Sequence, residues 1–109
     1  MLVNEIKEIT TDELHKKLQS GEKLNLVDVR EDDEVEEGMI PEARHIKMGE
    51  IPENLDAFDK DKEYIVICRS GGRSGNVCAY LQDQGYKVRN MAGGMLDWNG
   101  ETKKKSELA

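Results

Sequence analysis

The chain has 109 residues, with 16 Lys and Arg against 23 Asp and Glu, which gives a formal net charge of −7. This length fits one domain and is too short for two, and a hydrophobic content of 37% is sufficient for a small folded core. The acidic balance excludes nucleic acid as an expected partner, because contacts to phosphates need a surface rich in Lys and Arg.

The sequence predicts neither a membrane segment nor an export signal. No apolar run approaches the ~20 residues needed to cross a bilayer, and residues 1–5 lack the basic start and apolar stretch of a secretion signal. We therefore expect a cytoplasmic protein that contacts no membrane. Two cysteines, Cys68 and Cys78, are too few for a disulfide framework. Together with His15 and His45 they lack the spacing of paired zinc ligands, so no metal site is predicted.

The chain begins with a predicted edge strand over residues 6–9, followed by a helix that ends near Gln19. Thr10 and Glu13 have the three-residue spacing of a capping box, in which each side chain accepts a hydrogen bond from the other residue's backbone. Residues 24–29 form the next predicted strand, because β-branched residues favour an extended backbone.

The following segment contains an acidic run over residues 31–37. This run predicts one short, mostly solvated helix, and it is more simply a solvated face than a docking patch. Residues 43–48 are predicted as a strand, and Ile51, Leu55 and Phe58 mark a short helix or turn.

The second half of the chain predicts a buried strand, a helix and a further strand. Residues 64–67 form a continuous apolar run, which is typical of a strand covered on both faces of a parallel sheet. Ser74 is the predicted N-cap of a helix that ends before Gly85. Residues 86–90 are the last predicted strand.

The alternation of strands and helices predicts an α/β domain with a mainly parallel central sheet flanked by helices. Gly93 and Gly94 open a last turn that carries Trp98, which is expected in the core. We place a single domain over residues 1–100 and a charged, frayed C-terminal tail over residues 101–109.

Cys68 stands where ligands bind in parallel sheets, between the carboxyl end of a strand and the start of a helix. The helix dipole and the backbone amides of the loop favour an anion there, and Arg69 and Arg73 add positive charge. We therefore expect the pKa of the Cys68 thiol to lie well below the ordinary ~8.5. A cysteine nucleophile that is held ionised in this way needs no partner base.

Four segments resemble, in order and spacing, the motifs of single-domain rhodaneses: residues 26–30 (LVDVR), Glu34 followed by residues 38–43 (GMIPEA), residues 68–74 (CRSGGRS) and residues 93–98 (GGMLDW). The resemblance spans nearly the whole chain. It implies the rhodanese fold and a thiosulfate sulfurtransferase that requires no metal or organic cofactor. Such an enzyme takes a sulfane sulfur from a donor such as thiosulfate onto its cysteine as a persulfide, and passes it to cyanide or a thiol.

The resemblance also implies roles for individual residues. Cys68 matches the sulfur-accepting nucleophile, and the substrate-binding loop consists of Arg69, Ser70, Gly71, Gly72 and Arg73. Arg69 is the better candidate to meet the sulfonate oxygens of a donor. Arg73 has two interpretations: it contacts the substrate, or it pairs with Asp28 or Glu34 and anchors the loop. The two glycines allow positive φ, so that the loop amides converge on sulfur.

Residues outside the loop are predicted to be structural. Cys78 is expected to pack on the inner face of the helix that follows the loop, and His15 and His45 are expected to be structural or solvated. The second motif of the family commonly reads Gly-His-Ile-Pro-Gly-Ala, and here Met39 and Glu42 stand at the His and Gly positions. Because the loop rather than that histidine activates the thiolate, the exchange bears on fine placement more than on activity.

Three alternatives stay open. The first is a protein-to-protein persulfide relay, which the net charge of −7 supports because an acidic surface steers a basic partner and does little to gather a dianion. The second is a non-catalytic binding module of the same fold, which the intact Cys68 loop opposes. The third is an arsenate reductase or phosphatase, whose loops place five residues between Cys and Arg to hold a tetrahedral oxyanion. Only four residues separate Cys68 from Arg73.

Overall fold

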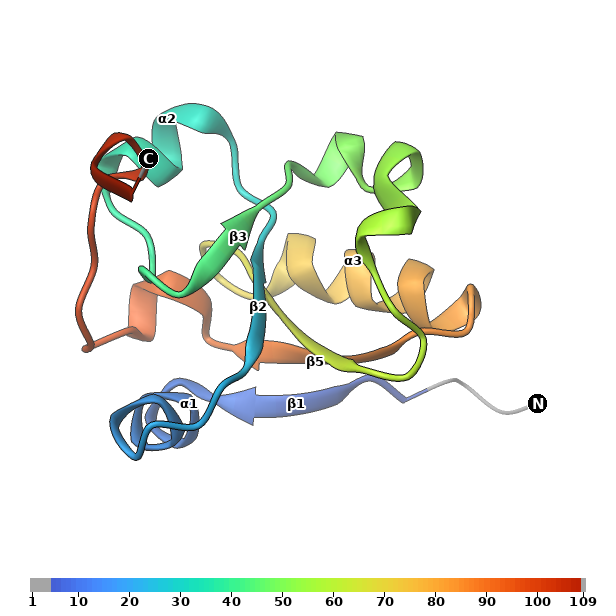
Figure 1. The fold of residues 1–109 in the computed structure, drawn as a ribbon, viewed down its shortest axis with the longest axis horizontal. Helices are drawn as coiled ribbons and strands as arrows, with labels where there is room; N and C mark the ends of the chain where they lie inside the picture. The colour runs from blue at the N-terminus through green and yellow to red at the C-terminus, as the bar shows by residue number, and fades with distance from the viewer. Residues whose placement is uncertain (1–4, 109) are drawn as a thin grey trace.

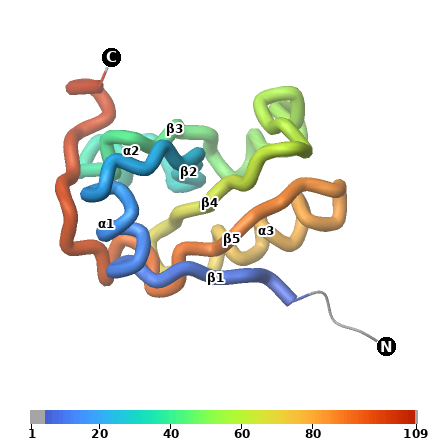
Figure 2. The backbone as a smooth tube through the Cα atoms, turned by 60° about the horizontal axis from the view of Figure 1, so that its bottom comes forward, coloured from blue at the N-terminus to red at the C-terminus, as the bar shows by residue number. Residues whose placement is uncertain are grey.

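Five strands form one central sheet in which all neighbouring pairs are parallel (Figure 1). The strands are β1 (Lys7–Thr10), β2 (Asn25–Asp28), β3 (Ala43–His45), β4 (Glu63–Ile67) and β5 (Lys87–Ala92). Their order across the sheet is β1-β5-β4-β2-β3, so β4 is the central strand and β1 lies at an edge, as predicted. Figure 2 shows β1, β5 and β4 side by side. The predicted α/β fold with a parallel central sheet is confirmed.

The structure is a computed structural model in which residues 5–108 are described. Residues 1–4, which belong to the stretch where no export signal is predicted, lie outside the described residues, as does Ala109 at the end of the predicted tail. Between residues 5 and 108, no helix is both long enough and apolar enough to span a bilayer.

Residues 5–108 also form three α-helices and four short 3-10 helices, of which the last two follow β5. The α-helices are α1 (Thr11–Gln19), α2 (Asp32–Glu37) and α3 (Gly72–Asp83). The 3-10 helices are η1 (Met48–Glu50), η2 (Pro52–Ala57), η3 (Gly94–Asp97) and η4 (Lys105–Leu108). The capping box predicted for α1 is confirmed, since the Thr10 hydroxyl accepts from the Glu13 N–H at 3.0 Å and the Glu13 carboxylate accepts from the Thr10 N–H at 2.9 Å.

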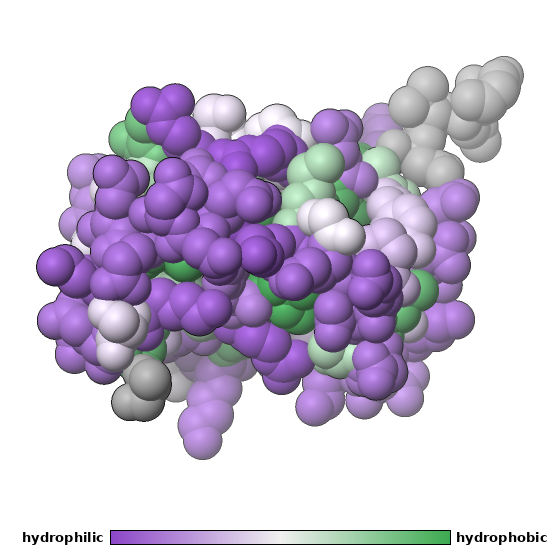
Figure 3. All heavy atoms as spheres, turned by 90° about the horizontal axis from the view of Figure 1, so that it is seen from above, coloured by the Kyte–Doolittle hydropathy of each residue, from purple (hydrophilic) through white to green (hydrophobic). Residues whose placement is uncertain are grey.

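Two apolar layers cover the two faces of the sheet. Successive side chains of a strand point to opposite faces. Tyr64 and Val66 of β4 accordingly pack in the layer that includes the inner side of α3, whereas Ile65 and Ile67 pack in the layer that includes Leu14 of α1. The predicted burial of this strand on both faces is confirmed. The face shown in Figure 3 is mostly hydrophilic, with small apolar areas between polar side chains.

Helix α3 starts earlier than predicted. Its N-cap is Gly71, which has a φ of 100°, and the first helical residue is Gly72. A left-handed φ of this size is favourable for glycine, so the chain turns into the helix at this residue. The prediction that Ser74 is the N-cap is therefore wrong. Ser74 lies in the first turn of α3 and is completely buried.

Residues 101–108, predicted as a charged, frayed tail, make hydrogen bonds to the rest of the domain. Met39 and Lys103 form an antiparallel bridge, with N···O distances of 2.8 and 2.9 Å. Glu36 of α2 accepts hydrogen bonds from the Ser106 hydroxyl at 2.5 Å and from the Ser106 N–H at 3.1 Å. Helix η4 consequently lies beside α2 (Figure 1). Sequence inspection missed this contact because its partners are about seventy residues apart.

Candidate active site

Cys68 directly follows the central strand β4 and precedes the loop that leads into α3. The carboxyl ends of all five strands lie at this edge of the sheet, since the strands are parallel. The cysteine is 0% exposed, and it is a free thiol. The structure thus places Cys68 at the position expected from the sequence, with its sulfur enclosed by the loop.

Hydrogen bonds from the loop and the first turn of α3 reach the sulfur. The Gly71 N–H donates to Cys68 Sγ at 3.0 Å, and the Ser74 hydroxyl oxygen lies 3.2 Å from the same atom. Burial raises the pKa of the thiol, but the Ser74 hydroxyl and the backbone N–H groups of Ser74, Gly71 and Ser70 lower it by more. The pKa of Cys68 is therefore below its ordinary value, in the direction predicted.

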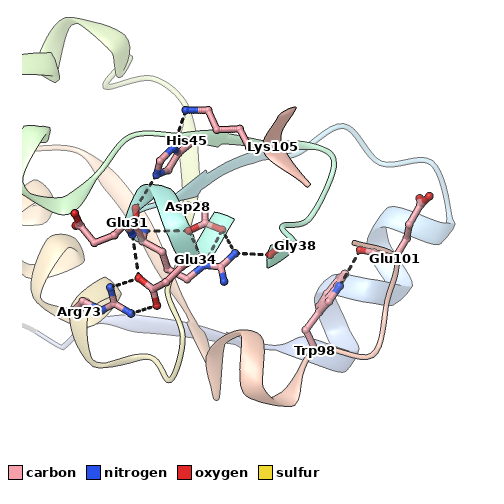
Figure 4. A network of polar contacts seen from close by, with 10 residues as sticks. Asp28, Glu31, Glu34, Gly38, His45, Arg73, Trp98, Glu101 and Lys105 are labelled. Carbon is pink, nitrogen blue, oxygen red and sulfur yellow. Dashed lines mark hydrogen bonds and ion pairs between the residues drawn. The ribbon is translucent and has the colours of Figure 1, made fainter. Parts of the chain in front are cut away.

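The two arginines of the loop have different surroundings. Arg73 forms a two-pronged ion pair with Glu34 of α2, with N···O distances of 2.7 and 2.8 Å (Figure 4). This pairing holds the pKa of the Glu34 carboxyl down to about 2. Arg69, in contrast, is exposed, and its guanidinium makes no hydrogen bond or ion pair within residues 5–108. Arg73 therefore links the loop to α2, while Arg69 is free to meet a ligand.

Asp28, the other partner considered for Arg73, is occupied elsewhere. It is completely buried at the end of β2 and pairs with Arg30 through N···O distances of 2.8 to 3.1 Å. Arg30 also donates to the Gly38 carbonyl at 2.8 Å (Figure 4). Of the two expected partners of Arg73, the structure selects Glu34 and excludes Asp28.

The backbone after β5 supports the loop from one side. The Met95 N–H donates to the Cys68 carbonyl at 2.9 Å, and the Leu96 N–H donates to the Arg69 carbonyl at 3.0 Å. Gly94 makes this approach feasible, because a Cβ at that position would collide with the Arg69 carbonyl. This close approach explains why glycine occupies position 94, a steric reason that was not evident from the sequence.

Asn90 is the site residue that sequence inspection missed. It lies in β5, is 6% exposed, and its Oδ1 is 2.5 Å from the Ser74 hydroxyl oxygen. Its Nδ2 donates to the Gly71 carbonyl at 3.0 Å. The available signal was an Asn within the strand predicted over residues 86–90, because Asn is depleted in strands.

The second cysteine has a different environment. Cys78 is 0% exposed in the apolar layer under α3, which confirms the packing role expected of it. Burial, together with the nearby charge of Cys68, raises the pKa of Cys78 to about 12. Its thiol therefore stays protonated at neutral pH and is a poor nucleophile.

The histidines have structural contacts outside residues 68–73. His45 Nε2 lies 2.6 Å from the Arg30 carbonyl, and the Lys105 ammonium donates to His45 Nδ1 at 2.9 Å (Figure 4). His15 packs edge-on against Trp98, with ring centroids 5.4 Å apart. Met39, at the position of the family's histidine, is 1% exposed and packs in the interior.

Comparisons with known proteins relate the chain to one group. The rhodanese-like domain family matches residues 10–101. A Bacillus subtilis (strain 168) protein with the name "Putative sulfurtransferase YtwF" is 61% identical over 102 residues, which are 94% of this chain and 99% of that protein. A sulfurtransferase of Allochromatium vinosum is 40% identical over 94 residues, covering 85% of this chain and 88% of its own length. The crystal structure of a rhodanese-like domain protein from Staphylococcus aureus has a TM-score of 0.84 at 44% identity, covering 88% of this chain and 94% of that chain.

Proposed function

The chain belongs to the rhodanese-like domain family, a sulfurtransferase family, and on that basis we propose that Cys68 carries sulfur as a persulfide between a donor and an acceptor. The proposed donor is thiosulfate or a persulfide, and the proposed acceptor is cyanide or a thiol. The residues proposed to bind the donor are those of the loop, Arg69, Ser70, Gly71, Gly72 and Arg73.

The observation that carries this proposal is the environment of the Cys68 sulfur. It receives a hydrogen bond from the Gly71 N–H at 3.0 Å and lies 3.2 Å from the Ser74 hydroxyl, and its pKa is below the ordinary value. A thiolate supported in this way attacks an electrophilic sulfur without a general base. The backbone N–H groups of the loop can support the negative charge of a persulfide.

The proposed reaction balances in two steps. The Cys68 thiolate attacks the outer sulfur of thiosulfate, the sulfur–sulfur bond of the donor breaks, and its electron pair leaves with sulfite. Cys68 then carries a second sulfur that bears the negative charge. Cyanide or a thiolate attacks this outer sulfur and leaves as thiocyanate or as a new persulfide, which returns Cys68 to the thiolate.

Arg69 supports thiosulfate as a donor. Its guanidinium is exposed and unengaged within residues 5–108, next to the nucleophile, so it can bind sulfonate oxygens with two parallel N–H donors. The four residues between Cys68 and Arg73 make a smaller loop than the five of phosphatases, which favours one sulfur atom over a phosphoryl group.

A second candidate function is transfer of the persulfide between proteins. Leu96 favours it, because this apolar side chain is 61% exposed and its N–H binds the carbonyl of Arg69. An exposed leucine beside the loop suits contact with another protein better than contact with a small anion. The net charge of −7 would steer a basic partner toward the chain.

Intact mass spectrometry tests the proposal. After incubation with thiosulfate, the protein should gain one sulfur atom, and cyanide should remove it. Cys68→Ser should gain no sulfur, whereas Cys78→Ser should behave like the parent. Loading by a low-molecular-weight persulfide but not by thiosulfate would support the relay. Loading of the Cys68→Ser protein, or no loading by either donor, would overturn the assignment.

A further inference from the structure

Asn90 has no part in the transfer described above, yet its amide group is buried beside the loop. Asn90 lies in β5 and pairs with Val66 of β4. Val66 precedes Cys68 by two residues, so the Asn90 side chain lies near the start of the loop. Its Nδ2 donates to the Gly71 carbonyl at 3.0 Å, and its Oδ1 faces the Ser74 hydroxyl at 2.5 Å. Because a carbonyl only accepts hydrogen bonds, the Gly71 carbonyl fixes this orientation of the amide.

The Ser74 hydroxyl has one proton and two acceptors within reach. One acceptor is Asn90 Oδ1 at 2.5 Å, and the other is Cys68 Sγ at 3.2 Å. A single proton serves only one of them at a time. When Cys68 is a neutral thiol, the proton belongs to the closer oxygen of Asn90. When Cys68 is a thiolate, the charged sulfur is the stronger acceptor, and Asn90 Oδ1 is left without a donor.

Two glycines, Gly71 and Gly75, lie beside the Asn90 amide. Gly75 lies within the first turn of α3, where glycine is less favourable than alanine. A Cβ at Gly75 would lie 3.4 Å from Asn90 Nδ2, and a Cβ at Gly71 would lie 3.8 Å from the same atom. Both are van der Waals distances, so the Asn90 amide packs directly against the backbone at the start of α3.

We propose that Asn90 is a positioning residue that competes with Cys68 for the Ser74 hydroxyl proton. Asn90 holds this proton while the cysteine is neutral, and the proton turns to the sulfur when Cys68 ionises. Without the Asn90 acceptor, the hydroxyl would be directed at the sulfur in both states. Asn90 thereby limits how far the loop favours the thiolate.

The competition has a consequence that rests on the proposed function. In a persulfide, the negative charge lies on the outer sulfur and Cys68 Sγ is neutral. The Ser74 proton then returns to Asn90, which stabilises the loaded state relative to the free thiolate. The competition itself concerns only the thiol and the thiolate, so it can be measured without any sulfur donor.

The test is the pH dependence of Cys68 alkylation by iodoacetamide in a Cys78→Ser background. Asn90→Leu keeps the branched shape of the side chain and removes its acceptor. The midpoint should fall by about half a unit to one unit, which is the effect of one hydrogen bond to sulfur. Ser74→Ala should raise the midpoint. In the Ser74→Ala background, Asn90→Leu should no longer lower the midpoint, because the shared proton is absent and only the Nδ2 contact to the Gly71 carbonyl is lost.

Further variants separate this role from a merely structural one. Asn90→Ala, which removes the acceptor without introducing a larger side chain, should act like Asn90→Leu and replaces it if the leucine prevents folding. Asn25→Leu is the matched control, because Asn25 lies in a strand and its side chain bonds only the Glu63 carbonyl among the described residues. The proposal is overturned if Asn90→Leu fails to lower the midpoint, or if it lowers the midpoint equally in the Ser74→Ala background.

Discussion

Cys68 and Cys78 show how one residue type acquires two reactivities ten residues apart in the sequence. Both side chains are 0% exposed, so burial opposes ionisation at each position. At Cys68, hydrogen bonds from the loop and from Ser74 outweigh the effect of burial and lower the pKa of the thiol. At Cys78, burial raises the pKa to about 12. Ionisation therefore follows the donors around each sulfur rather than its burial.

We accordingly expect the two cysteines to respond differently to substitution. Cys68→Ser should abolish thiocyanate formation from thiosulfate and cyanide, because the nucleophile is removed while a similar volume is kept. Cys78→Ser should retain most of the activity. A steady-state thiocyanate assay, with circular dichroism to verify folding, measures both. An active Cys68→Ser protein alongside an inactive Cys78→Ser protein would reverse the assignment.

Substitution of Arg69 and of Arg73 by alanine should also have different effects on activity and stability. Arg69→Ala removes an unengaged guanidinium, so it should raise the thiosulfate KM and lower kcat/KM by about tenfold to a hundredfold without changing Tm. Arg73→Ala breaks the ion pair with Glu34 and should lower Tm as well. Thermal melts and kinetics of both variants check this. An Arg73→Ala protein with the parental Tm and only a KM defect would place Arg73 at the substrate.

At the scale of the elements, the ion pair between Glu34 and Arg73 fastens α2 to the active-site loop. The pKa of Glu34 is about 2 in the folded chain, against an ordinary value of 4.5. A carboxyl whose pKa is lowered by folding stabilises the protein above its unfolded pKa, and this contribution is lost as the pH falls through the folded pKa. The link is therefore complete above about pH 4.5 and disappears toward about pH 2.

The stability of Glu34→Gln should follow that pH window. At neutral pH, the variant should unfold with about 1–2 kcal/mol less free energy than the parent, a value reduced for partial solvent exposure of the pair. The difference should shrink as the pH falls from 4.5 toward 2. Urea denaturation at several pH values measures it. A difference that stays constant across this range would show that the ion pair is not its source.

The turn after β5 gives a second prediction at this scale. Gly94→Ala should destabilise the protein by about 2–4 kcal/mol and lower sulfur transfer, because its Cβ would collide with the Arg69 carbonyl and its φ is 63°. Gly49→Ala is the matched control, since no atom lies within 4 Å of the added Cβ. Denaturation and activity assays of both variants decide the point. Equal effects of the two substitutions would contradict the steric explanation.

Patterns of a few adjacent residues predicted most helices and strands, but they could not predict contacts between segments that are distant in the sequence. The capping box of Thr10 and Glu13 and the apolar run of β4 are properties of a few adjacent residues, and both appear in the structure. The loop around Cys68 was predicted because its motif is continuous in sequence. Asn90 was missed because it reaches Ser74 only through the pairing of β4 with β5.

At the scale of the whole molecule, net charge distinguishes the two kinds of donor. A chain with a charge of −7 repels thiosulfate, and salt screens that repulsion. The second-order rate of Cys68 loading by thiosulfate should therefore rise a few-fold as ionic strength increases, when measured by stopped-flow or quenched mass spectrometry. Loading by a basic protein donor should slow over the same range. A thiosulfate rate that falls with salt would point to a local positive field that outweighs the net charge.

The strand order β1-β5-β4-β2-β3 also fixes when the thiol becomes reactive during synthesis. The ribosome completes β1 first, but this strand pairs only with β5, which is made last. Met95 and Leu96, whose N–H groups hold the carbonyls of Cys68 and Arg69, also emerge after the nucleophile. A nascent chain that ends before residue 90 should thus carry Cys68 as an ordinary thiol. Because translation proceeds from the N-terminus, the Cys68 thiol should become a reactive thiolate only after β5 joins the sheet.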